Sequence, residues 1–459
     1  MTHQASTADA MAALEALHAH TAVYTAPSAV ESLLDRIGWP DADGVLLDPG
    51  AGDGAFLVAA MNRLAPLPGD FAAAARVRGL EIHPGAAADA RERLAGALAM
   101  MGWTRDDARR AAEVSVRNAD FLIDGYDGPE PSFIAGNPPY MRFARLPQAF
   151  KDAYAAILPK VAKGDLQHAF LDRCAALLRP DGAIAFVTAD RWLLNDGSAP
   201  LRAALGRTLG VDHVGRLDAA SCFYRPKNRR SGTPPRVHPV EIVLRAAGVA
   251  EHALGADPFS PDGPAESWDG PVLADVATVR LAPYLGPVGG FLLDAGQSQA
   301  FDAERLVPAL DLDDIDFDTG TVRRPTRFAL LTDPAEEPTG VVRDHLLAAL
   351  PTMPKKVREG RWWCPPEPVN RDLGRPALLI PRIAKGIRAV LVEGGVLPVN
   401  HNITVVTDER GTGLERLRDA LTSDAAQEWV VRHAPRLEDG YHDIRTTLVR
   451  RIPLYGWDG

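Results

Sequence analysis

The residues best suited to do chemistry are at positions 137–140, where the sequence reads Asn-Pro-Pro-Tyr after an apolar run. Asn137 offers a side-chain carbonyl and Pro138 a backbone carbonyl, and Pro138 and Pro139 together hold both acceptors in place. Two such acceptors can take both hydrogens of a planar amino group and draw its nitrogen toward tetrahedral geometry. Tyr140 adds a flat face for stacking. The segment suits a reaction at an amino nitrogen that needs no catalytic His or Cys, although alone it also suits a rigid turn.

A glycine-rich segment, Asp-Pro-Gly-Ala-Gly-Asp-Gly-Ala-Phe, precedes it at residues 48–56. Its glycines allow a tight turn and close approach to a ligand where a first strand meets a first helix. They are Gly50, Gly52 and Gly54. A dinucleotide loop or a plain turn has the same glycine pattern. Asp48 and Asp53 would repel a pyrophosphate, however, and they suit the cationic sulfonium of S-adenosylmethionine.

Further candidate residues follow the next predicted strands. Glu81 ends one strand, where a carboxylate can accept hydrogen bonds from both ribose hydroxyls, although an exposed strand-end Glu is the simpler reading. Asp120 can accept from an adenine amino group while Phe121 packs on the ring, or it can cap a helix. A base in a duplex must be flipped out and held by a second aromatic residue. We choose Phe223 for this role, with Tyr224 as the alternative and a core aromatic as the simpler reading.

The bulk composition indicates a globular protein of two domains. At 459 residues the chain is too long for one ordinary core, and 46% hydrophobic and 24% charged residues are typical of soluble proteins. No apolar run is long enough to span a membrane, and the start lacks a signal peptide. The cysteines form no CxxC pair, so we expect no disulfide, no metal site and a cytoplasmic location.

Strand and helix patterns alternate from residue 45 to 247, which predicts a mostly parallel α/β sheet with helices on both faces. Predicted strands occupy residues 45–47, 77–82, 114–116, 133–135, 183–187 and 240–244, and predicted helices occupy 28–37 and 167–178. The second of these helices begins after Asp165, a natural N-cap.

Four regions follow from these patterns. We expect a helical arm at 1–23, a catalytic domain at 24–250, a Pro/Gly/Asp-rich linker at 251–271 and a second domain at 272–459. The second domain is predicted to be mixed α+β, with strands at 377–380, 389–392 and 403–406 and a helix at 412–432.

The charge is negative overall, at -10, but basic residues cluster in two places. Residues 225–238 hold five Lys or Arg and no acid, and residues 355–361 hold four with one acid. Such runs indicate either phosphate contact or solvated loops. The candidates for DNA contact from these runs are Arg225, Lys227, Arg229, Arg230, Lys355, Lys356 and Arg361.

Together these segments resemble the gamma-class DNA N6-adenine methyltransferases of type II restriction–modification systems. The resemblance covers roughly residues 20–247 and extends to the second domain in arrangement only. It is carried by YTAP at 24–27, DPGAGDGAF at 48–56, GLE at 79–81, ADF at 119–121, NPPY at 137–140, DLQHAF at 165–170 and GAIAFVTADRWL at 182–193. It implies a Rossmann-like class I S-adenosylmethionine-dependent methyltransferase sheet followed by a target-recognition domain.

The resemblance also implies the ligands. S-adenosylmethionine binds and leaves as S-adenosylhomocysteine, and YTAP closes over its methionine end. The implied cofactor residues are Tyr24, Thr25, Asp48, Gly50, Gly52, Asp53, Gly54, Phe56, Glu81, Asp120, Phe121 and Asn137. The flipped adenine is held by Tyr140 and Phe223. The match at Phe223 is loose, because the Pro/Arg-rich residues 225–238 replace the family's usual short turn.

In the second domain the resemblance places Arg361, Trp362, Arg382 and Lys385 on elements facing DNA. It implies a monomer bound to double-stranded DNA at the nucleoid, with a cognate restriction endonuclease or defence-system subunits as partners and no membrane contact. Two alternatives stay open at this point. One is N-methylation of RNA or of a protein glutamine, and the other is a catalytically idle DNA-binding module.

Overall fold

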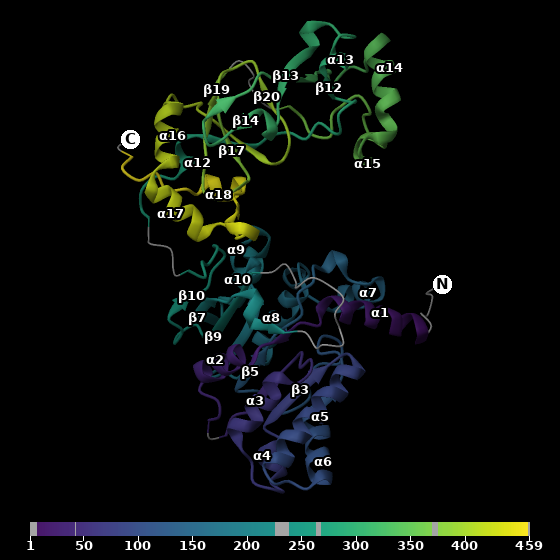
Figure 1. Cartoon of the computed structure of the whole chain (residues 1–459), viewed down its shortest axis with the longest axis vertical. Coiled ribbons are helices and arrows are strands. Elements are labelled where there is room, and N and C mark those ends of the chain that lie inside the picture. The colour runs from purple at the N-terminus through teal and green to yellow at the C-terminus, as the bar shows by residue number, and fades with distance from the viewer. Residues whose placement is uncertain (1–6, 42, 225–237, 263–267, 370–374, 458–459) are drawn as a thin grey trace. The chain divides into compact units, whose positions relative to one another are not determined.

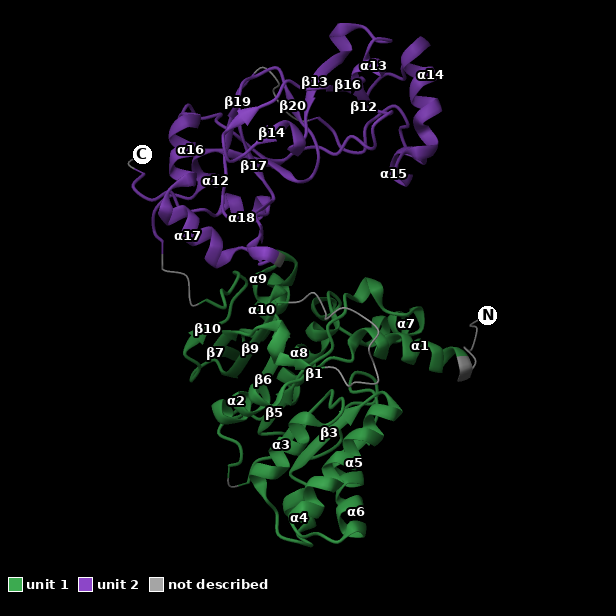
Figure 2. Ribbon diagram, in the orientation of Figure 1, with its two compact units in different colours: residues 1–265 green, residues 266–459 purple. Residues whose placement is uncertain are grey.

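The computed structural model describes residues 7–41, 43–224, 238–262, 268–369 and 375–457. They form two compact units, residues 1–265 (unit 1) and 266–459 (unit 2) (Figures 1 and 2). The division between the units lies inside the segment 251–271 that the sequence indicates as a linker. The start of that segment is nevertheless structured, because β10 (His252–Ala253) pairs with a strand of unit 1.

Unit 1 is built on an eight-stranded sheet in the order β10-β7-β9-β6-β5-β2-β3-β4. Its other strands are β2 (Leu46–Asp48), β3 (Val77–Glu81), β4 (Val116–Asn118), β5 (Phe133–Gly136), β6 (Ala183–Ala189), β7 (Leu209–Arg216) and β9 (Pro239–Ala246). The strands from β4 to β6 are parallel, and β9 is antiparallel to both of its neighbours. Strand order reverses at β2, between β3 and β5, and open α/β sheets bind ligands at such a switch point. The predicted α/β fold with a mostly parallel sheet is confirmed.

Helices cover both faces because successive strand residues point into two separate apolar cores (Figure 1). Leu46 and Ala135 pack with helices of one face, whereas Leu47 and Ile134 pack with helices of the other. The first face carries α2 (Pro27–Ile37), α3 (Ala55–Leu64), α5 (Pro84–Met100) and α6 (Arg105–Ser115). The second carries α1 (Thr7–Thr21), α7 (Gln148–Ile157), α8 (Leu166–Leu177) and α10 (Ala199–Leu205). None of the described helices has the length and apolar character needed to cross a membrane.

The structure corrects two predicted elements and adds a strand. Val114 and Ser115 belong to the last turn of α6, and the strand expected at 114–116 starts only at Val116. The strand β7 was not predicted. The helix expected over 412–432 is two helices, α16 (Leu414–Thr422) and α17 (Asp424–His433), because the Ser423 hydroxyl between them accepts the amide of Ala426 as an N-cap.

Unit 2 is mixed α+β, as predicted. One sheet has the order β11 (Thr278–Leu281), β21 (Ile403–Thr407), β17 (Ala377–Pro381), β19 (Val390–Val392). The other has the order β12 (Leu292–Asp294), β16 (Arg327–Leu330), β13 (Leu306–Leu310), β20 (Leu397–Pro398). Helices α16, α17 and α18 (Thr446–Arg450) pack on the first sheet, and α14 (Gly340–Ala349) packs on the second.

Arg202 of α10 connects residues 256–257, near the end of unit 1, to the core of that unit by hydrogen bonds. Its side chain is fully buried, and its guanidinium donates to the carbonyls of Trp192, Asn195, Ala256 and Asp257 at 2.6–3.2 Å. We expect Arg202→Met to lower the free energy of unfolding by about 3 kcal/mol, because it leaves these acceptors unpaired. Urea unfolding measures the change, with the exposed Arg207→Met as control. Equal unfolding midpoints for the two variants would contradict this account.

Candidate active site

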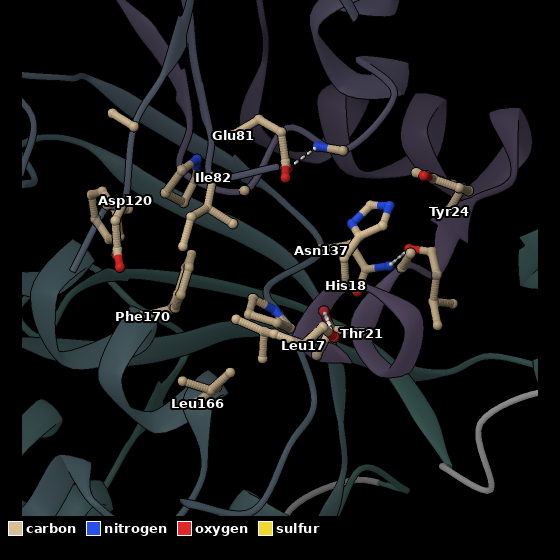
Figure 3. Close-up of a pocket in the computed structure, with 18 of the residues that line it drawn as sticks. Leu17, His18, Thr21, Tyr24, Glu81, Ile82, Asp120, Asn137, Leu166 and Phe170 are labelled. Carbon is tan, nitrogen blue, oxygen red and sulfur yellow. Dashed lines mark hydrogen bonds between the residues drawn. The ribbon is translucent and has the colours of Figure 1, made fainter. Parts of the chain in front are cut away.

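A pocket of about 720 Å³ lies at the switch point of the sheet (Figure 3). It is lined by the segments that follow β2, β3, β4 and β5, together with α1 and α8. Of the predicted cofactor residues it brings together Tyr24, Gly50, Gly52, Glu81, Asp120, Phe121 and Asn137. Leu166 and Phe170 of the DLQHAF segment also line it, as do residues that the sequence did not single out, including Leu17, His18, Thr21, Ile82 and Tyr154.

The glycine-rich loop needs glycine at two positions in particular. Gly52 and Gly54 adopt φ values of 56° and 83°, which L residues rarely adopt. A Cβ on Gly52 would lie 3.1 Å from the Tyr24 ring, and one on Gly54 would lie 3.1 Å from Ala90 of α5. Gly52 therefore lets Tyr24 close the pocket wall, and Gly54 lets α3 pack tightly on α5.

Two buried carboxyl groups end the strands on either side of this loop. Glu81 accepts the amide of Gly52 at 2.9 Å on one oxygen and that of His83 at 2.8 Å on the other, so it joins the loops after β2 and β3. Burial raises the pKa of Glu81, and burial raises that of Asp48 to about 8, although the Gly50 amide at 3.1 Å lowers it in part. No Lys or Arg in the described part of the chain pairs with either group. Each Glu81 oxygen has lone-pair capacity left for a further donor.

The raised pKa of Asp48 predicts a pH dependence of stability. The pKa is about 8 in the folded protein and 3.8 for an unperturbed Asp, so the folded state keeps its proton longer and stability falls as pH rises between these values. Asp48→Asn removes this titration. Its stability relative to wild type should therefore grow from about pH 5 to about pH 8 and then level off. Denaturant unfolding of both proteins across this window measures the difference, and a difference independent of pH would contradict the prediction.

Several predicted cofactor residues lie outside the pocket lining. Asp53 forms an ion pair with Arg93 and accepts the hydroxyl of Tyr224, so its charge is matched within the protein. This corrects the expectation that Asp53 faces a sulfonium. Thr25 lies with Asp53 on a separate groove. Behind the lining are Asp48, Gly54 and Phe56, which support the loop from within.

Asp120 and Phe121 line the pocket beyond β4, and both have partners there. One Asp120 oxygen accepts the amides of Leu122 at 2.8 Å and Ile123 at 3.3 Å, and the other accepts the Tyr154 hydroxyl at 2.8 Å. The two amides belong to a turn at residues 121–124, so Asp120 stabilises a turn beside the pocket and not the start of a helix. The Phe121 ring lies 5.2 Å from that of Phe170, and the pair forms an apolar wall suited to a flat ring.

The Asn-Pro-Pro-Tyr segment leaves β5 at the edge of the same pocket. The Asn137 side-chain amide donates to the Val23 carbonyl at 3.1 Å, which fixes the orientation of its own carbonyl (Figure 3). The Tyr140 hydroxyl reaches that carbonyl and lies 2.8 Å from the Val187 carbonyl. The Asn137 side-chain carbonyl and the Pro138 backbone carbonyl are therefore held rigidly. The Pro138 carbonyl has no hydrogen-bond donor among the described residues.

The pairing of two short strands places Phe223 and Tyr224 in different surroundings. β8 (Phe223–Tyr224) pairs antiparallel with β1 (Tyr24–Thr25). The Phe223 ring lies 6.4 Å from the Tyr140 ring, with an interplanar angle of 59°. Tyr224 instead lies 5.9 Å from the Tyr24 ring and donates to Asp53. Phe223 is thus the member of the pair beside Tyr140.

Helix α1 forms a wall that the sequence did not predict. The His18 ring stacks on that of His83 at 3.8 Å, and His83 lies 3.0 Å from Glu15. Because Nδ1 of His83 accepts the Ala86 amide at 3.2 Å, its proton is on Nε2, which donates to Glu15. The Ala-rich N-terminal sequence indicated only a helix, since contacts with residues some 65 positions away leave no local pattern.

Some of the residues predicted to contact DNA lie outside the described residues, and the others have partners within unit 2. Arg225, Lys227, Arg229 and Arg230 lie outside the described residues. In unit 2, Arg382 forms a two-pronged ion pair with Asp443 at 2.7 and 3.3 Å, and Lys385 lies over the Tyr441 ring. The others have local partners: Lys355 with Glu359, Lys356 with the Pro366 carbonyl, Arg361 with the Pro334 carbonyl and Trp362 with Trp363. Arg382 is the most firmly engaged of these side chains.

The chain is similar in sequence to restriction–modification methyltransferases. The family model of Eco57I restriction-modification methylases matches residues 122–216. Type II methyltransferase M.XhoI of Xanthomonas vasicola is 24% identical over 95% of this chain and 91% of its own length. Type II methyltransferase M.PaeR7I of Pseudomonas aeruginosa is 25% identical over 98% of this chain and 88% of its own.

Among solved structures, a putative class I S-adenosylmethionine-dependent methyltransferase from Listeria monocytogenes superposes with a TM-score of 0.35 and 12% identity. The match covers 51% of this chain and 66% of that one. The two type II methyltransferases, by contrast, align along both units. The predicted resemblance is confirmed as a similarity to type II restriction–modification methyltransferases, which extends over most of the chain.

Proposed function

We propose that the protein transfers a methyl group from S-adenosylmethionine to the N6 amino group of adenine in double-stranded DNA. The observation that carries this proposal is the pair of rigid carbonyl acceptors on Asn137 and Pro138 at the edge of a nucleotide-sized pocket. One amino hydrogen is accepted by each, and the nitrogen lone pair is then directed toward the pocket. Phe223 and Tyr140 stack on the base after it is flipped out of the duplex.

The pocket residues fit S-adenosylmethionine. Glu81 lines the pocket without a Lys or Arg partner among the described residues, and its two oxygens can accept further hydrogen bonds from hydroxyl donors. Glu81 holds the ribose hydroxyls, Phe121 and Phe170 pack on the adenine ring, and Asp120 borders its amino group. Gly50, Gly52 and Tyr24 line the rest of the site. The cofactor supplies an activated methyl group on sulfur.

DNA is preferred over RNA and protein as the acceptor because the chain aligns with type II methyltransferases through unit 2 as well as through unit 1. Unit 2 is proposed as the domain that recognises the DNA sequence. The setting that we propose is the cytoplasm at the nucleoid, with the protein acting as a monomer beside a cognate endonuclease or defence subunits.

The test is a labelled-methyl transfer assay. The purified protein is incubated with methyl-labelled S-adenosylmethionine and with plasmid DNA, total RNA or a glutamine-containing peptide. Label is expected only in DNA, and nucleoside digestion should give N6-methyladenine. Label in RNA, in peptide or in cytosine would overturn the proposal. Single-molecule sequencing of the product then gives the sequence context.

A further inference from the structure

A positively charged segment in unit 1 lies next to the catalytic motif. Residues 142–163, here called the basic segment, begin two positions after Tyr140 and include η1 (Phe143–Arg145), α7 and η2 (Lys160–Ala162). They contain five Lys or Arg and one acid, Asp152, which gives a net charge of five minus one, or +4, in a chain whose net charge is -10. The five are Arg142, Arg145, Lys151, Lys160 and Lys163.

These cations differ from most described arginines of unit 1, because none of them has an acidic partner among the residues that the structure describes. Arg36, Arg63, Arg117 and Arg245 form ion pairs with neighbouring carboxylates, as do others. Of the five cations, only Lys163 makes a side-chain hydrogen bond with a described residue, to the Ala155 carbonyl at 2.7 Å, and none of the five forms an ion pair with a described residue. The unmatched side chains are Arg142, Arg145, Lys151 and Lys160, of which all but the half-buried Lys151 are exposed.

The basic segment is held rigidly beside the active site. Its two ends are joined where the Met141 amide donates to Asp165 at 3.2 Å and the Leu166 amide donates to the Met141 carbonyl at 2.8 Å. Apolar side chains from its middle are buried in the core of unit 1: Leu146, Tyr154, Leu158 and Ala162. The Tyr154 hydroxyl also donates to Asp120 in the pocket wall. The cations of the segment are therefore fixed in position relative to the Asn-Pro-Pro-Tyr motif and to the pocket wall at Asp120.

We propose that the basic segment binds the phosphates of duplex DNA next to the nucleotide being methylated, through Arg142, Arg145, Lys151 and Lys160. This inference rests on the proposed function, and it gives the catalytic unit a DNA contact of its own. Fixed cations that lack an acidic partner release counterions from DNA without first breaking an internal ion pair. Contacts of this kind set the register of the protein on the duplex and carry no sequence information.

The test compares two matched double variants of the full chain. Arg142→Gln/Arg145→Gln removes two cations of the basic segment. Arg105→Gln/Arg109→Gln removes two cations of α6, which lies at the far end of unit 1 from α7 in Figure 1. Kd for a short mixed-sequence duplex is measured by fluorescence anisotropy over a series of salt concentrations. The logarithmic salt slope should fall by about two in the first variant and stay near the wild-type value in the second.

Further measurements separate the possible failures. In the Arg142→Gln/Arg145→Gln variant, KM for DNA should rise while kcat at saturating DNA and Kd for S-adenosylmethionine stay at wild-type values, and Lys151→Gln/Lys160→Gln should behave alike. If the wild type methylates DNA and the salt slope is unchanged in Arg142→Gln/Arg145→Gln, the role of the basic segment is overturned and the proposed function stands. Absence of any DNA methylation by the wild type overturns the proposed function instead. A change in the slope for duplex RNA and not for DNA would also overturn the inference.

Discussion

Replacing Asn137 by alanine should reduce the single-turnover rate of methyl transfer roughly 10²- to 10³-fold. The variant loses one of the two acceptors that hold the amino group, and the Tyr140 hydroxyl loses one of its two partners. It also loses the hydrogen bond to the Val23 carbonyl, which joins the motif to the segment before β1. Because Glu81 and the glycine-rich loop are untouched, Kd for S-adenosylmethionine should change by less than about tenfold.

Two comparison variants make this result specific. Asn137→Asp keeps an acceptor oxygen and loses the donor to Val23, so its rate should fall between those of wild type and Asn137→Ala. Asn62→Ala changes an exposed asparagine of α3 and should leave the rate unaltered. Rapid-quench measurement with labelled S-adenosylmethionine gives the rate, and calorimetry gives Kd. A normal rate in Asn137→Ala would show that the amino group is held elsewhere.

The central strands and the loops after them could be predicted from local sequence. Short apolar runs in front of Gly, Asp or Asn mark β2, β3 and β5, and the carboxyl ends of parallel strands lie at one edge of a sheet. Local pattern therefore brought Gly50, Gly52, Glu81 and Asn137 to one pocket, where the structure has them. The strand expected at 114–116 was misplaced because Val114 is an exposed residue at the end of a helix, a position that an apolar pattern cannot distinguish from a strand start.

The remaining features depend on contacts between distant parts of the chain. Asp53 is matched by Arg93 and by Tyr224, which is 171 residues away, so its sequence neighbours gave no sign of the pairing. Tyr154 and His18 line the pocket from helices whose own sequences contain no nucleotide-binding pattern. Which of Phe223 and Tyr224 lies beside Tyr140 depends on the register of β8 on β1. A resemblance identifies the segments of such a site, while packing decides which side chains face it.

Replacing Glu81 by alanine should weaken binding of S-adenosylmethionine by about 3 kcal/mol, or roughly 100-fold in Kd. The carboxylate offers each ribose hydroxyl an acceptor, and its two oxygens also hold the amides of Gly52 and His83. Removing it therefore leaves both loops of the site without their shared partner. Equilibrium dialysis or calorimetry with S-adenosylmethionine measures the loss, and Glu113→Ala, an exposed acid of α6, is the matched control.

Glu81→Gln separates charge from hydrogen bonding at the same position. Because burial raises the pKa of Glu81, part of the wild type is protonated at lower pH and resembles the amide. The carboxylate favours a cationic ligand, so the affinity of the wild type for S-adenosylmethionine should rise as the pH passes through this pKa. The affinity of Glu81→Gln should not show this rise. The ratio of the two affinities should therefore increase with pH. Because the charge of Glu81 contributes to the raised pKa of Asp48, the two affinities are compared in the Asp48→Asn background. A ratio independent of pH would show that Glu81 acts through its hydrogen bonds alone, and an unchanged Kd in Glu81→Ala would exclude this pocket as the cofactor site.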